Sequence, residues 1–437
     1  MANVFWSTTT GGDWNTPADW STGAVPGIGD DAVLGITGFA IIQYYTVSVT
    51  ASISVDSITI TDTGAVLAVV TAGVDAVAAD LTNAGDVELQ YGGTIGLSSD
   101  LTNTGVFDVD TQTDYGDNPS GGSSLTIGGT LTNSASLNIG NGILTGPSTV
   151  NAAALDNTGA INLTGNGSVG TTKQAVLDVA AVAPTIWTGS ISLSGQALLE
   201  YGSGEIGTVA AAAEIYLASA DGYVADASDT TSNSALTGLT SDAGDFELQY
   251  GATVGLSGDL TVTGALNVDT QTNYGDTPSG GSSLTIVGTL TNSGGVNIGG
   301  AFFGVGLDTA TSTVSAAALD NTGAINLFGN STAGDTKQAV LDIAAAAPTT
   351  WTGSIALYGQ ALLEYGSGEI GTVAAGAEIY LASADGYIAD ASDTTANSAL
   401  SGLTDNAGDF ELQYGVTVDV SGDLSNTSVI NVDTTTD

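Results

Sequence analysis

The sequence has no cysteine, no histidine and no arginine among its 437 residues. Without cysteine, the chain can form neither a disulfide nor a thiolate metal site. Without histidine and arginine, it cannot build a histidine-based triad, an imidazole metal site or an arginine clamp. We therefore expect a protein that is not an enzyme. The less favoured alternative is a polysaccharide-degrading enzyme that works with carboxylates alone, using the repeated pairs Glu200 with Glu205 and Glu364 with Glu369.

Positive charge is nearly absent as well. Two lysines, Lys173 and Lys337, stand against 46 acidic residues, and the formal net charge is −44. Such a chain offers no cationic surface to nucleic acid phosphates and is repelled by anionic membranes. No apolar run reaches the roughly eighteen residues that would predict membrane insertion. The expected partners are cations, neutral glycans or further copies of the chain, because counter-ions must offset its self-repulsion. The lysines are expected to pair with Asp178 and Asp342.

What the sequence does contain is a long internal repeat. The stretch GDVELQYGGTIGLSSDLTNTGVFDVD begins at Gly85 and returns at Gly244 and Gly408, the second offset being slightly longer than the first. Offsets of about 160 residues are too long for one structural rung, so each copy must hold several stacked elements. The expected organisation is an N-terminal cap in residues 1–60, leading coils in 61–84, repeat units in 85–243 and 244–407, and the start of a truncated third unit in 408–437.

A shorter phrase recurs within the copies, in which leucine, a polar residue, asparagine, a small residue and glycine precede alternating apolar residues. Its asparagines include Asn83, Asn103, Asn133 and Asn157, which follow one another at unequal steps. A turn followed by a short strand recurs roughly every 20 to 30 residues. This pattern indicates the coils of a parallel β-helix. Asparagine amides would stack in a ladder, and glycine would supply a positive φ at the corner. We therefore predict an all-β, right-handed parallel β-helix (β-solenoid). An array of β-sandwich modules is the alternative.

The first sixty residues lie outside the repeat and are rich in tryptophan. Trp6, Trp14 and Trp20 stand among glycine and proline turns, ahead of alternating segments at 45–49 and 53–60 that are typical of strands. A solenoid needs an atypical first coil to cover the open end of its core. We expect the tryptophans to pack inside this cap rather than to form a platform for sugars.

Clusters of aspartate and asparagine on turns offer the hard oxygen ligands that calcium prefers. One set lies in FDVDTQTDYGD and its copy, and the other lies in DGYVADASD and its copy. The predicted Ca²⁺ ligands are Asp108, Asp110, Asp114, Asp117, Asn267, Asp269, Asn273, Asp276, Asp221, Asp226, Asp229, Asp385, Asp390 and Asp393. The alternative is that these residues simply favour turns, and the net charge favours calcium. Glu88, Glu247 and Glu411 alternate with apolar residues, so they should face outward on strands.

Several stretches resemble those of large bacterial surface and secreted proteins, the β-strand-repeat adhesins and autotransporter-like passengers. They are the opening GDWNTPADWSTGAVPGIGDDAVL, the strands YTVSV and VDSITI, and rungs such as LTNTGVFDVD and LDNTGAINLTG. The resemblance covers nearly the whole chain. It implies a parallel β-helix, secreted or held at the bacterial cell surface, that adheres, scaffolds biofilm or assembles into layers and filaments.

From the charge and this resemblance together we expect a self-assembling structural protein, a homopolymer whose acidic loops calcium bridges or rigidifies. The alternative is an adhesin that binds glycans or host surfaces. Such an adhesin would present the tyrosines Tyr91, Tyr115, Tyr201, Tyr250, Tyr274 and Tyr365.

Overall fold

The computed structural model describes residues 2–35, 44–112, 121–167, 172–270, 280–302, 305–306, 310–330 and 338–433. Strands dominate these ranges, which contain no α-helix and three short 3-10 turns, η1 (Pro17–Asp19), η2 (Ser234–Leu236) and η3 (Ser398–Leu400). Accordingly, no helix in the described ranges is long and apolar enough to cross a membrane.

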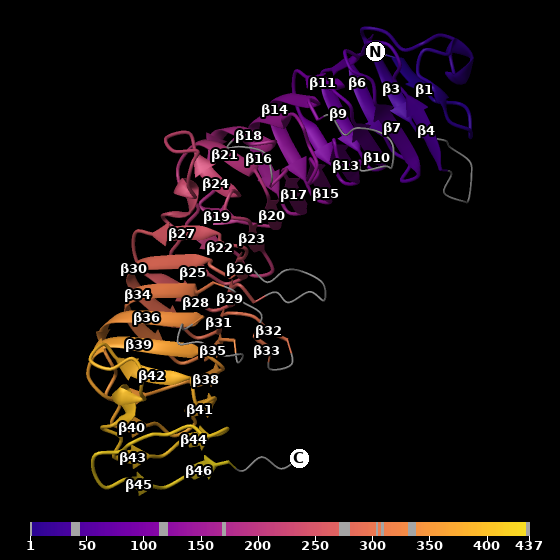
Figure 1. The fold of residues 1–437 in the computed structure, drawn as a ribbon. Helices are drawn as coiled ribbons and strands as arrows, with labels where there is room; N and C mark the ends of the chain where they lie inside the picture. Colours follow the sequence, from indigo (N-terminus) through magenta and orange to yellow (C-terminus); the bar gives the residue numbers. More distant parts are fainter. Residues whose placement is uncertain are drawn as a thin grey trace. The chain divides into compact units, whose positions relative to one another are not determined.

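The chain divides into two compact units (Figure 1). The first unit comprises Met1–Pro184, Thr188–Gly204 and Asp221–Ala235, and the second comprises Thr185–Trp187, Glu205–Ala220 and Leu236–Asp437. These units are defined by contacts, so they are distinct from the repeat units defined by sequence.

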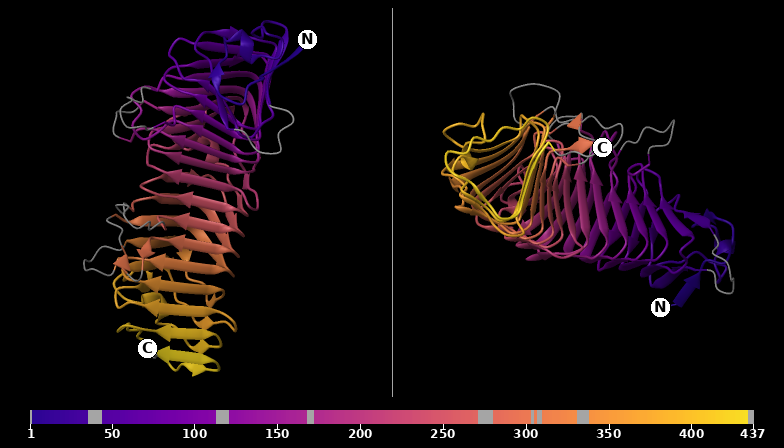
Figure 2. Two further views of the ribbon diagram at one scale, coloured as in Figure 1. Left: turned by 90° about the vertical axis from the view of Figure 1, so that its right-hand side faces the viewer. Right: turned by 90° about the horizontal axis from the view of Figure 1, so that it is seen from below.

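Each unit is a stack of coils that lay parallel strands on three faces (Figure 2). A strand pairs in register with its counterpart in the next coil, as when Val87 of β10 (Asp86–Leu89) lies opposite Phe107 of β13 (Val106–Val109). Pairings between the described strands are parallel, except for the hairpin of β32 (Ala301–Phe302) and β33 (Val305–Gly306). The predicted all-β parallel solenoid is therefore confirmed, and its right-handed sense stays a prediction. The β-sandwich alternative does not fit, because such modules are built from antiparallel sheets.

In the first unit, the faces follow one another in the order in which each coil visits them. The first face contains β5 (Ile53–Ser54), β8 (Asp75–Ala78), β11 (Thr94–Leu97), β14 (Ser124–Asn133), β16 (Ser148–Asn157), β18 (Ala175–Val182), β21 (Ala197–Ser203) and β24 (Tyr223–Asp226). The second face contains β1 (Ala2–Phe5), β3 (Asp30–Leu34), β6 (Ser57–Ile60), β9 (Asp80–Asn83), β12 (Leu101–Asn103) and the later halves of β14 and β16. The third face contains β2 (Gly12–Asp13), β4 (Tyr45–Ser48), β7 (Ala65–Val69), β10, β13, β15 (Ser136–Ile139), β17 (Ala160–Thr164) and β20 (Ser190–Ser194).

The second unit repeats this plan. Its first face contains β27 (Thr253–Leu256), β30 (Ser283–Asn292), β34 (Ser312–Asn321), β36 (Ala339–Ala346), β39 (Ala361–Ser367) and β42 (Tyr387–Asp390). Its second face contains β19 (Ile186–Trp187), β22 (Thr208–Val209), β25 (Ser241–Asp242), β28 (Leu260–Val262), the later halves of β30 and β34, and β37 (Thr350–Trp351), β40 (Thr372–Val373), β43 (Asp405–Asn406) and β45 (Ser425–Asn426). Its third face contains β23 (Glu214–Ala218), β26 (Asp245–Leu248), β29 (Ala265–Val268), β31 (Gly295–Ile298), β35 (Ala324–Phe328), β38 (Ser354–Tyr358), β41 (Glu378–Ala382), β44 (Asp409–Leu412) and β46 (Val429–Val432).

The core lies inside the coils because strand side chains alternate between two sides. In β6, Ile58 and Ile60 are buried, while Ser57 and Thr59 are only partly so. In β13, Phe107 and Val109 are fully buried in the same way. Burial of each large aliphatic side chain stabilises the fold by roughly 1.5–3 kcal/mol, so the stacked aliphatic rows supply most of the stability.

The predicted asparagine ladder is present at the corner between the second and third faces. Asn83 donates from Nδ2 to Oδ1 of Asn103, Asn103 donates to Asn133, and Asn133 donates to Asn157, each at 2.8 Å. The second Nδ2 hydrogen of Asn83 goes to the carbonyl oxygen of Val106 at 2.8 Å. These amides are buried, and each one ties its coil to the next.

The role predicted for the corner glycines was wrong in its physical reason. Gly85 and Gly105 are not among the residues with positive φ. A Cβ on Gly105 would stand 2.1 Å from the carbonyl oxygen of Gly85 in the preceding coil, so glycine is required there by close approach. Positive φ occurs instead after the third face, at Tyr91 (56°) and Asp110 (51°).

The tryptophans of the first sixty residues pack inward, as predicted. Trp6 and Trp14 each meet Trp20 edge to face, with ring centroids 5.1 and 4.8 Å apart. Trp20 donates from Nε1 to the carbonyl oxygen of Trp14 at 2.7 Å. All three side chains are buried, so they cannot serve as a sugar platform.

Candidate functional site

The first predicted metal set is divided between two environments. Asp108 is half-buried on the outer side of β13, and its Oδ1 accepts a hydrogen bond from Asn138 Nδ2 at 2.7 Å. Asp110 is buried, and its positive φ turns its side chain into the corner. In the next copy, Asn267 and Asp269 take the same two places. Four further predicted ligands lie outside the described residues: Asp114, Asp117, Asn273 and Asp276.

The carboxylate of Asp110 is saturated with hydrogen bonds from the chain itself. It accepts from the backbone N–H groups of Tyr91 and Ser123, both at 2.9 Å, and from the hydroxyls of Ser123 and Ser148 at 2.8 and 2.7 Å. Asp269 accepts the four equivalent bonds, from Tyr250, Ser282 and Ser312. A buried carboxylate with this many donors is stable without a cation. Its role in this structure is to tie three chain segments together at a corner.

The second predicted set caps turns. Asp226 accepts hydrogen bonds from the backbone and hydroxyl of Ser228, and Asp229 accepts from the backbone N–H and hydroxyl of Thr231. These donors lower the pKa of Asp226 and lower that of Asp229 to about 2, the hydroxyl of Ser232 contributing most to the latter. Asp390 and Asp393 repeat the pattern with Ser392 and Thr395, while Asp221 and Asp385 are exposed nearby. These are the turn bonds of the alternative interpretation.

The structure brings together a different acidic group, on the third face of the second unit. Glu214 of β23 lies opposite Asp245 of β26, and Glu247 follows two residues later on the same side of β26. One carboxylate oxygen of each residue lies within 4.8 Å of the others. Among the described residues, no other group of three acidic side chains brings its ligand atoms this close together. We call these three residues the carboxylate cluster.

Equivalent residues recur in the other copies. In β41 and β44, Glu378 lies opposite Asp409, and Glu411 follows. In the first unit, Asp86 and Glu88 of β10 carry the same two positions, and Asp108 of β13 lies opposite Glu88. The third carboxylate thus comes from the preceding coil in two copies and from the following coil in one. The predicted outward direction fits the strand alternation at all three glutamates. Glu88 and Glu411 are half-buried, whereas Glu247 is covered on that outer side and is only 5 % exposed.

Burial and mutual repulsion both disfavour the charged forms in these groups. Burial, and then the charges of Asp108 and Glu88, raise the pKa of Asp86 to about 6. Burial, followed by the charge of Asp245, raises the pKa of Glu214. Glu378 has a raised pKa for the same reasons, burial first and then Asp409 and Glu411. The chain itself therefore leaves these carboxylates short of positive partners.

A row of amides leads into the cluster from the coils that follow. Asn326 donates to Asn297 at 2.9 Å, Asn297 donates to Asn267 at 2.9 Å, and Asn267 donates to Oδ1 of Asp245 at 2.8 Å. Gln249 also donates to Glu247 at 2.8 Å. All these amides present N–H groups toward the carboxylates, so they orient the cluster and partly offset its charge.

Lys173 is the one cationic side chain within the described residues, and it lies away from the acidic groups of the third face. Its Nζ stands 3.6 Å from the ring centroid of Tyr223 and donates to the backbone oxygen of Asp221. Burial lowers its pKa to about 8, against the opposing charge of Asp221. The expected partner Asp178 instead lies on β18, where its charge acts on Glu200. Lys337 and its expected pairing with Asp342 lie outside the described residues.

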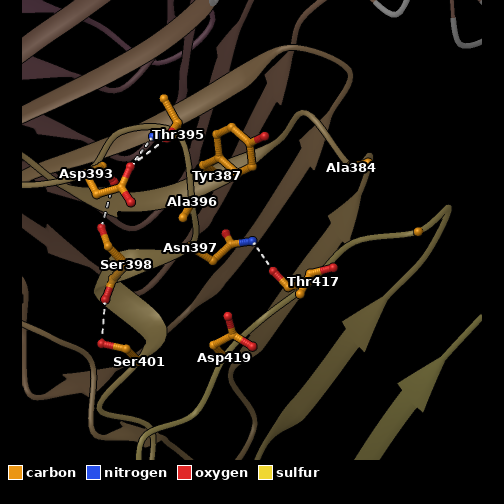
Figure 3. Close-up of a pocket in the computed structure, with 11 residues that line it drawn as sticks. Ala384, Tyr387, Asp393, Thr395, Ala396, Asn397, Ser398, Ser401, Thr417 and Asp419 are labelled. Carbon is orange, nitrogen blue, oxygen red and sulfur yellow. Dashed lines mark hydrogen bonds between the residues drawn. The ribbon is translucent and has the colours of Figure 1, made fainter.

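A recess of about 430 Å³ lies in the second unit beside η3 (Figure 3). Asn397 at its base donates to the carbonyl oxygen of Thr417 at 3.0 Å and accepts from the backbone N–H of Ile388. Asp393 points back to Thr395, and Asp419 is exposed at the rim. The lining is largely polar, but its buried amide and one of its two carboxylates already make hydrogen bonds within the fold.

The tyrosines predicted to meet glycans are not all accessible. Tyr201 and Tyr365 are each 1 % exposed, and Tyr115 and Tyr274 lie outside the described residues. An outer row of aromatic rings does exist on the third face, where Phe328 stacks on Tyr358 with centroids 4.9 Å apart and planes inclined by 11°. This stacking joins neighbouring coils and stabilises them.

Sequence reasoning missed the cluster because Glu214 and Asp245 belong to different coils and are far apart in the chain. The signal was present in the repeated stretch itself, where aspartate and glutamate two residues apart must share one side of a strand. Comparison with known proteins adds no assignment, since no family model, no curated protein and no solved structure matches the chain.

Proposed function

We propose that the protein is a non-enzymatic extracellular structural protein, an acidic solenoid that self-assembles into filaments, layers or a biofilm matrix. Divalent cations, with calcium as the physiological ion, neutralise its carboxylate clusters and join neighbouring molecules. The observation that carries the proposal is the approach of three carboxylate oxygens, from Glu214, Asp245 and Glu247, to within 4.8 Å of one another. Acidic residues recur at the corresponding strand positions of the third face in the other copies. No described cation neutralises them.

The chemistry of the cluster favours a bridging role. Calcium takes six to eight oxygen ligands at about 2.3–2.6 Å. The residues Glu214, Asp245 and Glu247 supply three carboxylates, so several coordination positions are left for water or for oxygens of a second molecule. A repeat that presents the same group once per copy would give successive attachment points. The high negative charge keeps molecules apart until such ions are present.

The test uses the full chain, stripped of divalent ions with a chelator and returned to calcium, magnesium or sodium at equal ionic strength. Equilibrium dialysis measures bound calcium, while light scattering and electron microscopy measure assembly. Calcium should bind and produce ordered polymers, and the four-fold variant Glu214→Gln, Glu247→Gln, Glu378→Gln, Glu411→Gln should bind less calcium and assemble less, because only the group of the first copy keeps all of its carboxylates.

The matched control removes the same charge elsewhere, through Glu200→Gln, Glu205→Gln, Glu364→Gln and Glu369→Gln. It should bind calcium and assemble like the unchanged protein. Equal loss in both variants would show that net charge alone matters. An unchanged protein that stays monomeric in calcium and binds none would overturn the proposal.

A further inference from the structure

One position of the buried asparagine corner carries an acid. Asn83 and Asn406 are equivalent residues of the first and third copies, and Asp242 stands between them in the second. All three are fully buried. Asp242 lies on β25, with Val209 of β22 opposite on one side and Val262 of β28 opposite on the other. A carboxylate here has neither solvent nor a cation to stabilise it.

The two oxygens of Asp242 occupy different environments. Oδ1 accepts a hydrogen bond from the backbone N–H of Gly244 at 3.1 Å, as Oδ1 of Asn83 does from Gly85 at 3.0 Å. Oδ2 therefore takes the place of the asparagine Nδ2. It is buried and has no donor within the described chain.

The asparagines show what a group at that place must do. Asn83 Nδ2 donates one hydrogen to Oδ1 of Asn103 and the other to the carbonyl oxygen of Val106, both at 2.8 Å. Asn406 donates in the same way to Asn426 and Val429, again at 2.8 Å. The carbonyl partner is 23 residues further along the chain in both cases.

In the second copy, the set of acceptors is smaller by one. The counterpart of Asn103 is Val262, which lies opposite Asp242 and accepts nothing. The counterpart of the Val106 carbonyl is that of Ala265 (242 + 23), at the start of β29. One acceptor remains where two were present. An amide would leave one N–H unused there, whereas a protonated carboxyl has a single O–H to donate.

We propose that Asp242 is held in its neutral, protonated form and donates its Oδ2–H to the carbonyl oxygen of Ala265, in place of the asparagine amide of the other copies. The corner of this coil is then a pH-sensitive joint. When Asp242 ionises, its proton passes to solvent and two acceptor oxygens face each other inside the corner. That arrangement favours local opening between β25 and β28.

The environment of Asp242 favours its protonated form. Burial raises the pKa of Asp242 to about 7, the Gly244 N–H opposes the shift, and the charge of Asp245 on β26 adds to it. Asp245 is in turn flanked by Glu214 of β23 and Glu247 of its own strand. The paired neighbours Val209 and Val262 are uncharged, so no group from the second face stabilises the carboxylate.

The sign of the pH effect follows from the raised pKa. The stability contribution of the protonated form is complete below the ordinary aspartate value near pH 4 and is lost as the pH rises toward about 7. One proton is involved, so the equilibrium constant for opening this corner should rise up to about tenfold per pH unit across that window and then level off.

The test is hydrogen exchange of the full chain between pH 4.5 and pH 8.5, read by mass spectrometry and corrected for the intrinsic exchange rate. The segment 241–265 should lose protection as the pH rises, while the equivalent segment 405–429, which carries Asn406 and Asn426, serves as the control in the same molecule. Asp242→Asn should abolish the difference in pH dependence between the two segments. The infrared band of protonated carboxyls at pH 5.5, with aspartate isotopically labelled, should also lose intensity in Asp242→Asn, and the part that remains should come from Asp86.

The variant pair Asp242→Asn with Val262→Asn rebuilds the arrangement of Asn406 and Asn426. It should protect segment 241–265 at every pH, and it keeps the test valid if Asp242→Asn alone folds poorly. Identical pH profiles in the unchanged protein and in these variants would overturn the proposal. So would a carboxyl band at pH 5.5 whose intensity is undiminished in Asp242→Asn.

Discussion

Ser148 donates a hydrogen bond from its Oγ to Oδ2 of Asp110 at 2.7 Å, although 38 residues separate the two in the chain. Ser312 makes the same bond to Asp269 at 2.7 Å across 43 residues. The segment between the aspartate and the serine is therefore five residues longer in the second copy (43 − 38). This longer segment contains the β32–β33 hairpin. The corner carboxylate, rather than the length of the loop, sets the register.

Neutralising Asp110 and neutralising Asp108, two residues apart at the end of β13, should affect the stability of the fold differently. Asp110→Asn replaces an acceptor oxygen with an amide and deprives at least one buried donor of its partner, which should cost about 1.5–3 kcal/mol. Asp108→Asn removes a charge that raises the pKa of Asp86 and Glu88, so it should leave stability unchanged or slightly increased. The midpoint of urea unfolding measures both. Equal destabilisation by the two variants would contradict the structural role given to Asp110.

The asparagine corner should tolerate valine only beside an acid. Asn103→Val leaves a buried Nδ2 hydrogen of Asn83 without an acceptor, at a cost of about 1–3 kcal/mol. The double variant Asn83→Asp with Asn103→Val transplants the Asp242 and Val262 pair, and it should recover much of this loss at pH 5 but not at pH 8. Thermal unfolding at the two pH values measures the recovery, with Thr102→Val as the control. No recovery at pH 5 would argue against the donor count at this corner.

Without divalent cations, the protein should be less stable at neutral pH than in mild acid. Burial and neighbouring charges raise the pKa of Asp86 to about 6 and raise those of Glu214 and Glu378. A raised folded-state pKa means that the stability contributed by these groups is greatest below about pH 4 and falls as the pH rises through the folded-state value. The melting temperature in chelator should therefore fall between pH 5 and pH 7.5. Asp86→Asn should reduce the fall, and a melting temperature that rises instead would refute this account of the clusters.

The aromatic row should contribute to stability. Tyr358 contacts both Phe328 and Tyr380, whereas the equivalent position of the first unit is Ser194. Tyr358→Ser should cost about 0.5–1.5 kcal/mol beyond the lost burial. Tyr414→Ser, at a tyrosine that is 66 % exposed, is the control and should have little effect. Urea unfolding compares the two variants, and similar midpoints would show that the ring contacts do not contribute to stability.

The asparagine corner could be predicted from sequence because its chemistry is local. Each phrase carries its own amide and its own glycine, so coils of unequal length still bring Asn83, Asn103, Asn133 and Asn157 into line. The carboxylate cluster could not be predicted because it depends on which strands become neighbours, and the varying loop lengths conceal that register.

The inward position of Asp110 could not be predicted from the sequence, for a different reason. Two residues after Asp108, it should have shared the outer side of β13. Its φ of 51° ends the alternation and turns the side chain inward. The sequence pattern has no sign of this, because Asn267 and Asp269 in the next copy look equally like turn ligands.

The register of the asparagine corner also means that the molecule can change length only in whole steps. The tetrapeptide DLTN occurs at Asp80–Asn83 and again at Asp100–Asn103, at paired places of β9 and β12. Excision of residues 81–100 would join identical sequences and delete one coil, shortening the stack by about 4.8 Å. Duplication of the same segment would lengthen it by the same increment. The corner therefore makes the coil a unit of exchange, a segment that recombination can add or remove without redesigning its neighbours.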